Sequence, residues 1–198
     1  MKYPKSIQNL IDSFSKLPTV GPKTAERYVF YLLKQSGEDL QQFAQSIAEL
    51  KENIVICKNC LAVTETDPCS ICRDKNRDQA LICVVANTRD LNSIELTSVY
   101  KGGYHVLGGL INAIEAIKPD QLTIKQLIKK IKANKIKEVI LALNPNMEGE
   151  TTALYLAKIL KPYKIKITRL ARGLSTGSDL EYADQSTLAN ALKFRNEL

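Results

Sequence analysis

Hydrophobic residues in the first quarter of the chain recur at helical spacing, with one interruption. Apolar side chains at positions 7, 10, 11, 14 and 17 lie one or three residues apart, and the pattern resumes at positions 25, 29, 32 and 33. Residues 17–24 separate the two runs and contain Pro and Gly, which commonly mark turns. A third apolar stripe occupies residues 39–53. The pattern predicts two helices joined by a tight hairpin, followed by a third helix.

From residue 81 the pattern changes to short continuous apolar runs that alternate with helical stretches. Four runs have the length of strands, at residues 81–85, 104–107, 139–143 and 165–170. Strands that are apolar on both faces are typical of a parallel sheet covered by helices on both sides. Thr123 is the expected N-cap of the helix between the second and third strands. We therefore expect an α/β protein with several modules.

Four cysteines between the two regions have the spacing of a metal site. Cys57 and Cys60 form one C-x-x-C pair, and Cys69 and Cys72 form a second pair after eight intervening residues. Each pair can turn back onto one ion, so the pattern predicts a closed, structural Zn²⁺ site with four thiolates, one ion per chain. Two disulfides are the alternative. Cys83 lies in an apolar run and is expected to be a small buried hydrophobic residue on a strand.

Composition adds a charge argument. Lys and Arg number 28 against 21 Asp and Glu, a formal charge of +7 in 198 residues, which permits a polyanionic partner. Residues 124–137 contain six lysines and no acidic residue, which indicates either a solvated helix face or a secondary surface for contacts to DNA, in addition to the N-terminal hairpin considered next. The start of the chain has no apolar run of signal-peptide length, so we expect a cytoplasmic protein.

The N-terminal hairpin offers the first candidate interface. Gly21 is expected to take a backbone conformation closed to other residues, and Pro22 suits the first turn of a helix. Free N–H groups at that helix end can hold a DNA phosphate, while Lys23 and Arg27 lie one turn apart and can reach neighbouring phosphates. The segment, with the small Thr24 after the basic residue, resembles a helix-hairpin-helix motif in which Thr19 replaces the first glycine. An ordinary helical turn with a solvated basic face is the alternative.

A second candidate site follows the third predicted strand, where functional groups of parallel sheets gather. Glu148 and Glu150 open the next helix. They could bind a divalent cation or a basic partner residue, or they could simply stabilise the positive end of the helix. The lone histidine, His105, lies in a predicted strand far from any cysteine nucleophile, so we assign it a structural role.

Taken together, these segments resemble the RecR family of bacterial recombination mediators. The likeness covers the hairpin, the cysteine finger, residues 104–109, residues 144–150 and the tail from Arg172 to Leu188. It implies a helix-hairpin-helix module in residues 1–53, a four-cysteine zinc finger in 54–78, a Toprim domain in 79–168 and, in 169–198, a Walker-B-like segment that packs on the Toprim domain or a neighbouring subunit. It further implies dimeric or tetrameric rings around DNA, and a partnership with RecO, and in some bacteria RecF, in loading RecA onto DNA coated by single-strand-binding protein.

Catalytic Toprim domains hold Mg²⁺ with a glutamate after the first strand and an Asp-x-Asp pair after the third. Here Ala86 and Asn144 stand at the expected positions of the glutamate and the first aspartate, and metal chemistry needs several carboxylates. We expect a non-enzymatic mediator whose acidic patch, Glu148 and Glu150, contacts RecO. A Mg²⁺-dependent Toprim nuclease is the alternative. A base-excision glycosylase is a third hypothesis, although its cysteines hold an iron–sulfur cluster at another spacing.

Overall fold

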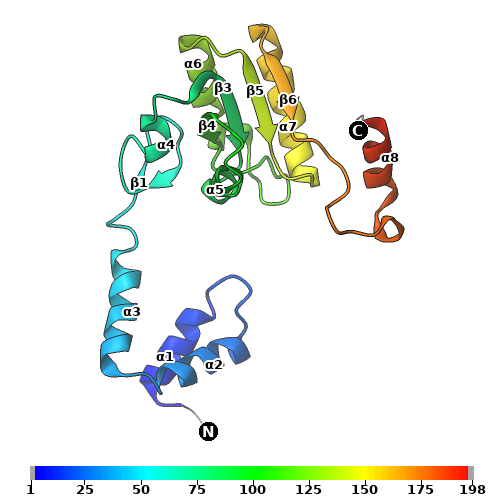
Figure 1. Cartoon of the computed structure of the whole chain (residues 1–198). Coiled ribbons are helices and arrows are strands. Elements are labelled where there is room, and N and C mark those ends of the chain that lie inside the picture. Colours follow the sequence, from blue (N-terminus) through cyan, green and yellow to red (C-terminus); the bar gives the residue numbers. More distant parts are fainter. Residues whose placement is uncertain (1–2, 196–198) are drawn as a thin grey trace. The chain divides into compact units, whose positions relative to one another are not determined.

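The computed structural model describes residues 3–195 and divides the chain into two compact units, Met1–Ile54 and Val55–Leu198. In the first unit, α1 (Lys5–Phe14) and α2 (Pro22–Leu32) form the predicted hairpin (Figure 1). Their core is small. Ile11 of α1 packs with Ala25 and Val29 of α2, and all three are buried. The helical spacing of the sequence therefore reflects a real packing face.

The backbone of the hairpin differs from the expectation in one respect. Gly21 has φ −79° and ψ 167°, an extended conformation that any residue adopts, so the prediction that Gly21 needs glycine's freedom is wrong. The left-handed residue is Thr19, with φ 66°. This is the position at which the helix-hairpin-helix pattern has its first glycine. The sequence thus places a β-branched residue where the turn favours glycine.

The third helix, α3 (Gly37–Glu49), has Ser36 as its N-cap, and the Ser36 hydroxyl accepts a hydrogen bond from the Asp39 N–H at 3.1 Å. None of its residues is buried. Its apolar stripe stays exposed within the chain and consists of Leu40, Phe43 and Ile47, continued by Leu50 just beyond the helix. Helical periodicity therefore predicted the helix correctly, although its apolar face is not buried by the rest of its own unit, Met1–Ile54, as far as that unit is described.

The second unit is built on a four-stranded sheet in which all neighbouring strands are parallel. The order is β4-β3-β5-β6, so β3 and β5 are central and β4 and β6 are the edges. The strands are β3 (Asp78–Val85), β4 (Gly102–Val106), β5 (Glu138–Ala142) and β6 (Lys166–Arg169). The four predicted strands are confirmed, with boundaries that differ by up to three residues.

Both faces of the sheet are covered, as the continuous apolar runs predict. Ile82 and Val84 of β3 pack in one core with residues of α6 (Ile124–Ala133) and α7 (Met147–Leu160). Cys83 and Val85 point to the opposite core, which contains Leu91 of α5 and three of the four clustered cysteines, Cys57, Cys60 and Cys69. Helix α5 spans Thr88–Leu96. The cysteine module is therefore one of the layers that bury the sheet, and the prediction that Cys83 is a core residue is confirmed.

The remaining elements are short. The cysteine module contains β1 (Val55–Ile56), β2 (Val63–Thr64) and α4 (Ser70–Arg73). Single 3₁₀ turns occur at Pro119–Gln121, Lys161–Tyr163 and Leu180–Tyr182, and the tail ends in α8 (Gln185–Lys193). In the tail, Asp184 acts as the N-cap of α8 by accepting from the Thr187 N–H at 3.0 Å. Within residues 3–195, no helix combines the length and apolarity that crossing a membrane requires.

Candidate metal centre and nucleic-acid interface

The four predicted metal ligands meet in one place. The sulfur atoms of Cys57, Cys60, Cys69 and Cys72 all lie within 4.8 Å of one another, and three of the four side chains are buried. The first pair is shaped by a tight turn in which the Leu61 N–H donates to the Cys57 carbonyl at 2.8 Å. Leu61 takes φ 64° there. Cys69 begins the second pair as the N-cap of α4, and its sulfur accepts from the Cys72 N–H at 3.4 Å.

The spacing of the sulfur atoms suits a metal ion. The Cys60 and Cys69 sulfurs are 3.6 Å apart, close to the roughly 3.8 Å edge of a tetrahedron with Zn–S bonds of about 2.3 Å. A disulfide requires about 2.05 Å. All five cysteines lie in the described part of the chain and all are free thiols, so the disulfide alternative is not supported.

The pKa values of the clustered cysteines also favour a bound cation. A hydrogen bond from the Cys72 thiol lowers the pKa of Cys60 to about 5, and the same contact raises the pKa of Cys72. One thiolate is thus held by its neighbours' protons, which a bound cation would replace. The cluster could hold a metal ion with all four positions taken by protein, which leaves none for a substrate.

Three contacts fasten the metal-binding loop to the sheet unit. The Val106 N–H of β4 donates to the Cys60 carbonyl at 2.8 Å. The Lys130 ammonium of α6 donates to the carbonyls of Asn59 at 3.3 Å and Tyr104 at 3.1 Å. The Val63 N–H donates to the Thr88 hydroxyl at 3.0 Å. Elements on both sides of the sheet therefore depend on the position of this loop. Lys130, noted in the sequence only as one of several lysines, has a defined structural role.

In the hairpin unit, the predicted DNA-binding residues lie at the start of α2. Gly21 is the N-cap, no side chain caps the helix end, and Pro22 occupies the first turn. Lys23 and Arg27 are exposed, and neither forms a salt bridge among the residues described. Thr24 is half-buried beside them. The backbone N–H groups of this helix end and two free cations thus share one surface, the arrangement that suits a phosphate.

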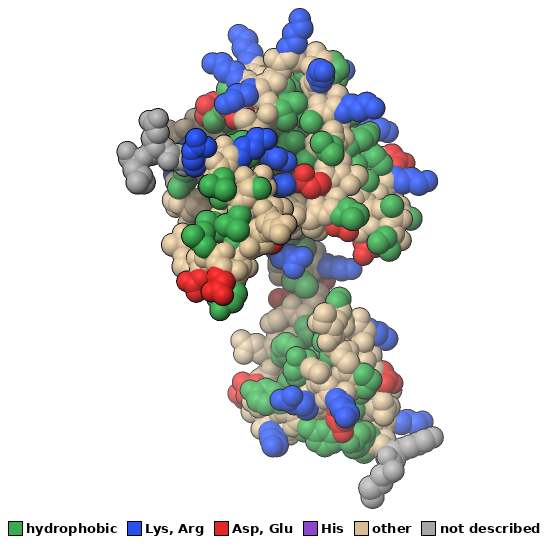
Figure 2. Space-filling view, turned by 90° about the vertical axis from the view of Figure 1, so that its right-hand side faces the viewer, with side chains coloured by type: hydrophobic (Ala, Val, Ile, Leu, Met, Phe, Trp, Pro, Cys, Tyr) green, Lys and Arg blue, Asp and Glu red, His purple; other side chains and the backbone are tan. Residues whose placement is uncertain are grey.

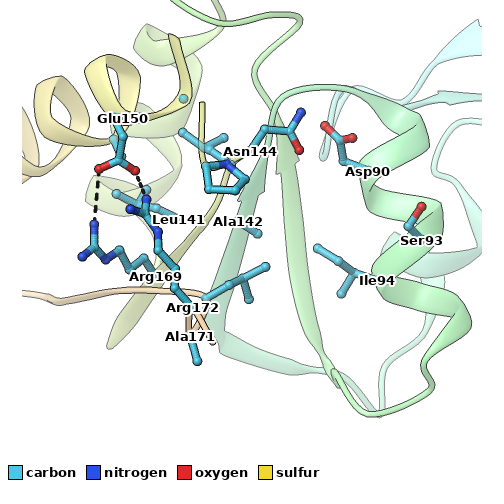
Figure 3. A pocket seen from close by; sticks show the side chains of 15 residues that line it. Asp90, Ser93, Ile94, Leu141, Ala142, Asn144, Glu150, Arg169, Ala171 and Arg172 are labelled. Carbon is cyan, nitrogen blue, oxygen red and sulfur yellow. Dashed lines mark hydrogen bonds and ion pairs between the residues drawn. The ribbon is translucent and has the colours of Figure 1, made fainter. Parts of the chain in front are cut away.

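The second predicted site lies at the carboxyl ends of the strands, as expected. A cavity of about 360 Å³ opens there between α5, the loop after β5 and the chain after β6. Figure 3 shows Asp90 and Ser93 on one side and Glu150 with Arg169 and Arg172 on the other. Asn146 caps α7 by accepting from the Gly149 N–H at 2.9 Å. This cap turns the helix so that Glu150 faces the cavity.

Glu150 is not a free carboxylate. Arg169 approaches it at 3.4 Å and Arg172 bonds its other oxygen, so that both guanidinium groups converge on one side chain (Figure 3). Glu148 is half-buried and forms no salt bridge among the described residues. Arg172 was noted in the sequence only as part of the tail, and Arg169 was missed. No local signal links them to Glu150, since Arg169 lies 19 residues further along the chain, at the end of β6, and Arg172 follows that strand.

The other carboxylate lining this cavity is also engaged. Asp90 and Asn87 form a reciprocal capping box at the start of α5, in which the Asp90 N–H donates to the Asn87 side chain at 3.1 Å and the Asn87 N–H donates back at 3.3 Å. Ala86 is buried directly after β3, and Asn144 follows β5. The positions that would hold Mg²⁺ in a catalytic Toprim domain thus carry a methyl group and an amide.

His105 lies on the α6 side of β4 and is 1% exposed. Its Nε2 bonds the Thr123 hydroxyl at 2.9 Å, and that hydroxyl donates to the Val106 carbonyl at 2.7 Å. Burial, with a smaller contribution from the Lys130 charge, lowers the pKa of His105 to about 4. Thr123 occupies the N-cap position of α6 as predicted, but its hydroxyl serves His105 and β4 and does not cap the helix.

One further buried pair was not foreseen. Residues 73–78 are charged except for Asn76 and contain no apolar side chain that would indicate burial. In the structure the Arg77 side chain is 10% exposed, pairs with Glu95 of α5 and donates to the Gly102 carbonyl at 3.0 Å. These contacts hold the beginning of β3 against α5 and β4. A run of alternating charges gives no indication of such a tertiary partner.

Comparisons with known proteins agree with this architecture. Residues 7–51 match the family model described as RecR, helix-hairpin-helix, residues 80–171 match the Toprim domain, and residues 173–196 match the RecR C-terminal model. The Recombination protein RecR of Staphylococcus aureus (strain JH9) is 48% identical over 198 residues, which cover the whole of both chains. The chain belongs to the RecR family. The RecR proteins of Staphylococcus saprophyticus and Staphylococcus haemolyticus are also 48% identical over their full length.

Membership of the RecR family confirms the resemblance seen in the sequence. The matched models include the helix-hairpin-helix and the Toprim domain, and the cysteine cluster lies in the segment between them. The division into four segments at residues 53, 78 and 168 and the roles of Lys23, Arg27, Glu148 and Glu150 stay predictions.

Proposed function

We propose that this protein is a non-enzymatic, DNA-binding recombination mediator that acts in bacterial DNA repair. It would act in the cytoplasm with RecO, and in some settings RecF, to load RecA onto DNA coated by single-strand-binding protein. The full-length likeness to proteins named Recombination protein RecR supports the recombination role. The helix-hairpin-helix match supports DNA as the ligand.

The pairing of Glu150 with Arg169 and Arg172 carries the non-enzymatic part of the proposal. Mg²⁺ requires a set of oxygen ligands that offset its charge. Here two guanidinium groups already neutralise the carboxylate that is best placed in the cavity, and Ala86 and Asn144 offer no carboxylate. The cavity is thus poorly suited to two-metal phosphoryl transfer. Glu148, which forms no salt bridge among the described residues, is the freer carboxylate for a basic residue of RecO.

The metal in the cysteine cluster is, on this proposal, one structural Zn²⁺ per chain. Four thiolates in a closed, largely buried set are typical of structural zinc sites. Bound there, the ion would fix the loop that Val106 and Lys130 hold to the sheet.

A ring-like homo-oligomer is part of the same proposal. Large apolar side chains stay exposed in the single chain on α3 and in the tail, among them Phe43, Ile47, Leu180 and Phe194. Exposed apolar faces of this kind commonly mark protein interfaces. Light scattering coupled to gel filtration measures the mass directly, and a monomer at micromolar concentration would contradict the ring.

DNA binding through the hairpin is tested by measuring affinity against salt for Lys23→Ala and Arg27→Ala. Each lost phosphate contact should lower the slope of log affinity against log salt by about 0.7 to 0.9 as well as weaken binding. Lys34→Ala is the matched control, because it removes the same charge from an exposed position just beyond the opposite end of α2. Wild-type slopes in both hairpin variants would show that the hairpin is not the interface.

The enzymatic alternative is tested in the same preparation. Labelled DNA incubated with the protein and Mg²⁺ should be retarded in a gel and stay intact. Cleavage that requires Mg²⁺ and is lost in Glu148→Gln would instead establish a Toprim nuclease. A brown preparation that contains iron would support the glycosylase hypothesis, while a colourless one with one zinc per chain would exclude it.

A further inference from the structure

A second basic site lies on the sheet unit, in a cleft between the metal-binding loop and α6. The cleft has a volume of about 250 Å³. Its lining includes Lys58 and Asn59 from the loop, His105 from β4, and Gln126, Lys129 and Asn134 from α6 or its end. All these residues belong to the unit Val55–Leu198, so the cleft does not depend on the hairpin unit. We call it the α6 cleft.

The α6 cleft is positively charged, and some of its lysines are available to a ligand. Lys129 is exposed, and the Lys58 side chain is 90% exposed, with one surface contact of 3.4 Å to Asp67. An ion pair as exposed as this contributes little stability and gives way easily. No acidic residue lines the cleft. Lys130 is committed to two carbonyl groups, so Lys58 and Lys129 are the cations that a ligand would meet.

His105, one of the residues that line the cleft, has a ring nitrogen without a hydrogen-bond partner in the described residues. The Thr123 hydroxyl donates to the Val106 carbonyl, so it must accept from His105, and His105 Nε2 therefore bears the proton. Nδ1 is left as an acceptor, buried and without a hydrogen-bond partner in the described residues. Buried polar atoms usually have a partner. One wall of the cleft therefore includes a neutral histidine that adds no charge of its own and keeps one nitrogen unpaired among the described residues.

A row of lysines continues from the cleft along α6. Lys125, Lys129 and Lys132 lie on one face of the helix, separated along its axis by about 6 Å and about 4.5 Å at the usual rise. None of them forms a salt bridge among the described residues. Figure 2 shows Lys and Arg side chains gathered at the upper end of this unit, the end at which α6 terminates in Figure 1.

This arrangement is unfavourable for the protein alone. Like charges three or four residues apart on a helix repel one another, and no acidic residue between 124 and 137 offsets them. A bound polyanion would remove that repulsion. The phosphates of a nucleic-acid strand follow one another every few ångströms along the axis, a spacing similar to that of the lysines.

We propose that the α6 cleft binds a backbone phosphate of nucleic acid and that Lys125, Lys129 and Lys132 contact the neighbouring phosphates. This inference rests on the proposed function, to which it adds a second contact surface on the sheet unit. Lysines and amides without an aromatic or arginine anchor are typical of sequence-independent phosphate contacts. Protein–protein hot spots favour Trp, Tyr and Arg, which the cleft does not contain, so an acidic peptide fits it less well.

Lysine protection in the wild-type, metal-loaded protein is the first test. The protein is acetylated briefly with and without a DNA strand of about 30 nucleotides, long enough to span several phosphate contacts, and modification is read by mass spectrometry. DNA should protect Lys58, Lys125, Lys129 and Lys132 severalfold, while the exposed Lys75 and Lys101 should be modified equally in both samples. Equal modification of the α6 lysines with and without DNA would overturn the proposal.

The second test compares Lys125→Gln/Lys129→Gln/Lys132→Gln with the control Lys75→Gln/Lys101→Gln/Lys158→Gln, which loses the same charge from other exposed positions. The α6 triple variant should bind DNA about tenfold more weakly and show a salt slope lower by about 2 to 3. Circular dichroism and metal content confirm folding. Equal behaviour of the two triple variants would overturn the proposal.

The results for the hairpin variants and the α6 triple variant distinguish the α6 cleft from the hairpin interface. If Lys23→Ala and Arg27→Ala abolish binding while the α6 variant binds as wild type, the α6 cleft is wrong and the hairpin interface stands. If the α6 variant alone loses affinity, the cleft stands and the hairpin assignment falls. A poly-glutamate peptide of the same charge that protects the α6 lysines as well as DNA does would overturn the nucleic-acid assignment.

Discussion

Single residues in this protein take their roles from the backbone and the partners that surround them. Thr19 has the left-handed conformation for which the motif normally uses glycine, whereas Gly21, the residue that looks as if it needs that freedom, is extended. Glu150 looks like a free acid in the sequence and is held by two arginines. The type of a side chain therefore identifies candidate residues, but it does not show their backbone conformation or whether they are already paired.

His105 gives a pH dependence that can be checked directly. Its pKa in the folded protein is about 4, below the ordinary value of about 6.5 for an unfolded chain. Between these values the unfolded state binds more protons, so the stabilisation present above pH 6.5 is lost as pH falls towards 4, by at most about 1.4 kcal/mol per pH unit.

As the only histidine in the chain, His105 has a unique imidazole proton signal in NMR, and its titration midpoint should lie near pH 4 or be preceded by unfolding. Replacement by Gln should remove this part of the acid sensitivity seen in urea unfolding. A midpoint near the ordinary value of about 6.5 in the folded protein would contradict the buried, neutral assignment.

The predicted helices and strands lie close to where the sequence pattern places them, and side-chain hydrogen bonds determine where several helices begin. Asn146 and Asn87 cap α7 and α5 and so place the loops that line the cavity at the end of the sheet. Gly149 lies at the beginning of α7, where an added Cβ would stand 1.9 Å from the Asn144 carbonyl oxygen. The turn into α7 is thus possible only with glycine. This turn directs Glu148 and Glu150 towards the end of the sheet at which the cavity lies.

Gly149→Ala should therefore destabilise the sheet unit by about 1 to 3 kcal/mol, because the backbone at Asn144 has to shift. Urea unfolding followed by circular dichroism measures the change. Gly37→Ala at the start of α3 is the control, since a Cβ there meets open space and alanine favours helix. It should be neutral or slightly stabilising. Equal effects of the two substitutions would show that the close approach at Gly149 does not exist.

On the scale of the whole molecule, the cysteine module is part of the layer that covers one face of the sheet. Its cysteines share a core with Cys83, Val85 and Leu91, and Val106 and Lys130 bind the loop directly. Loss of the metal should therefore destabilise the Toprim sheet as well as the loop. The lysines of α6 and the acidic α7 terminus lie in the same unit and depend on the same core.

Cys72→Ser should abolish stoichiometric metal binding and lower the melting temperature and solubility of the purified protein, since metal binding is coupled to folding. Zinc content by plasma emission and thermal unfolding provide the two measurements. Cys83→Ala removes a cysteine from the same core and should keep its metal, losing about 1 kcal/mol for the small cavity. A Cys72→Ser protein that melts as wild type does would mean that the metal is not structural.

The linear pattern of this chain was sufficient to predict the three N-terminal helices, the four strands of the sheet and the grouping of four cysteines, because helical spacing, apolar strands and C-x-x-C pairs depend on near neighbours in the chain. The pairing of Arg169 and Arg172 with Glu150, the burial of Arg77 against Glu95 and the convergence of Lys58 with Lys129 come only from the tertiary structure. These partners lie between 18 and 71 residues apart, and only the parallel sheet, which brings distant loops to the same edge and the same face, decides which charges meet.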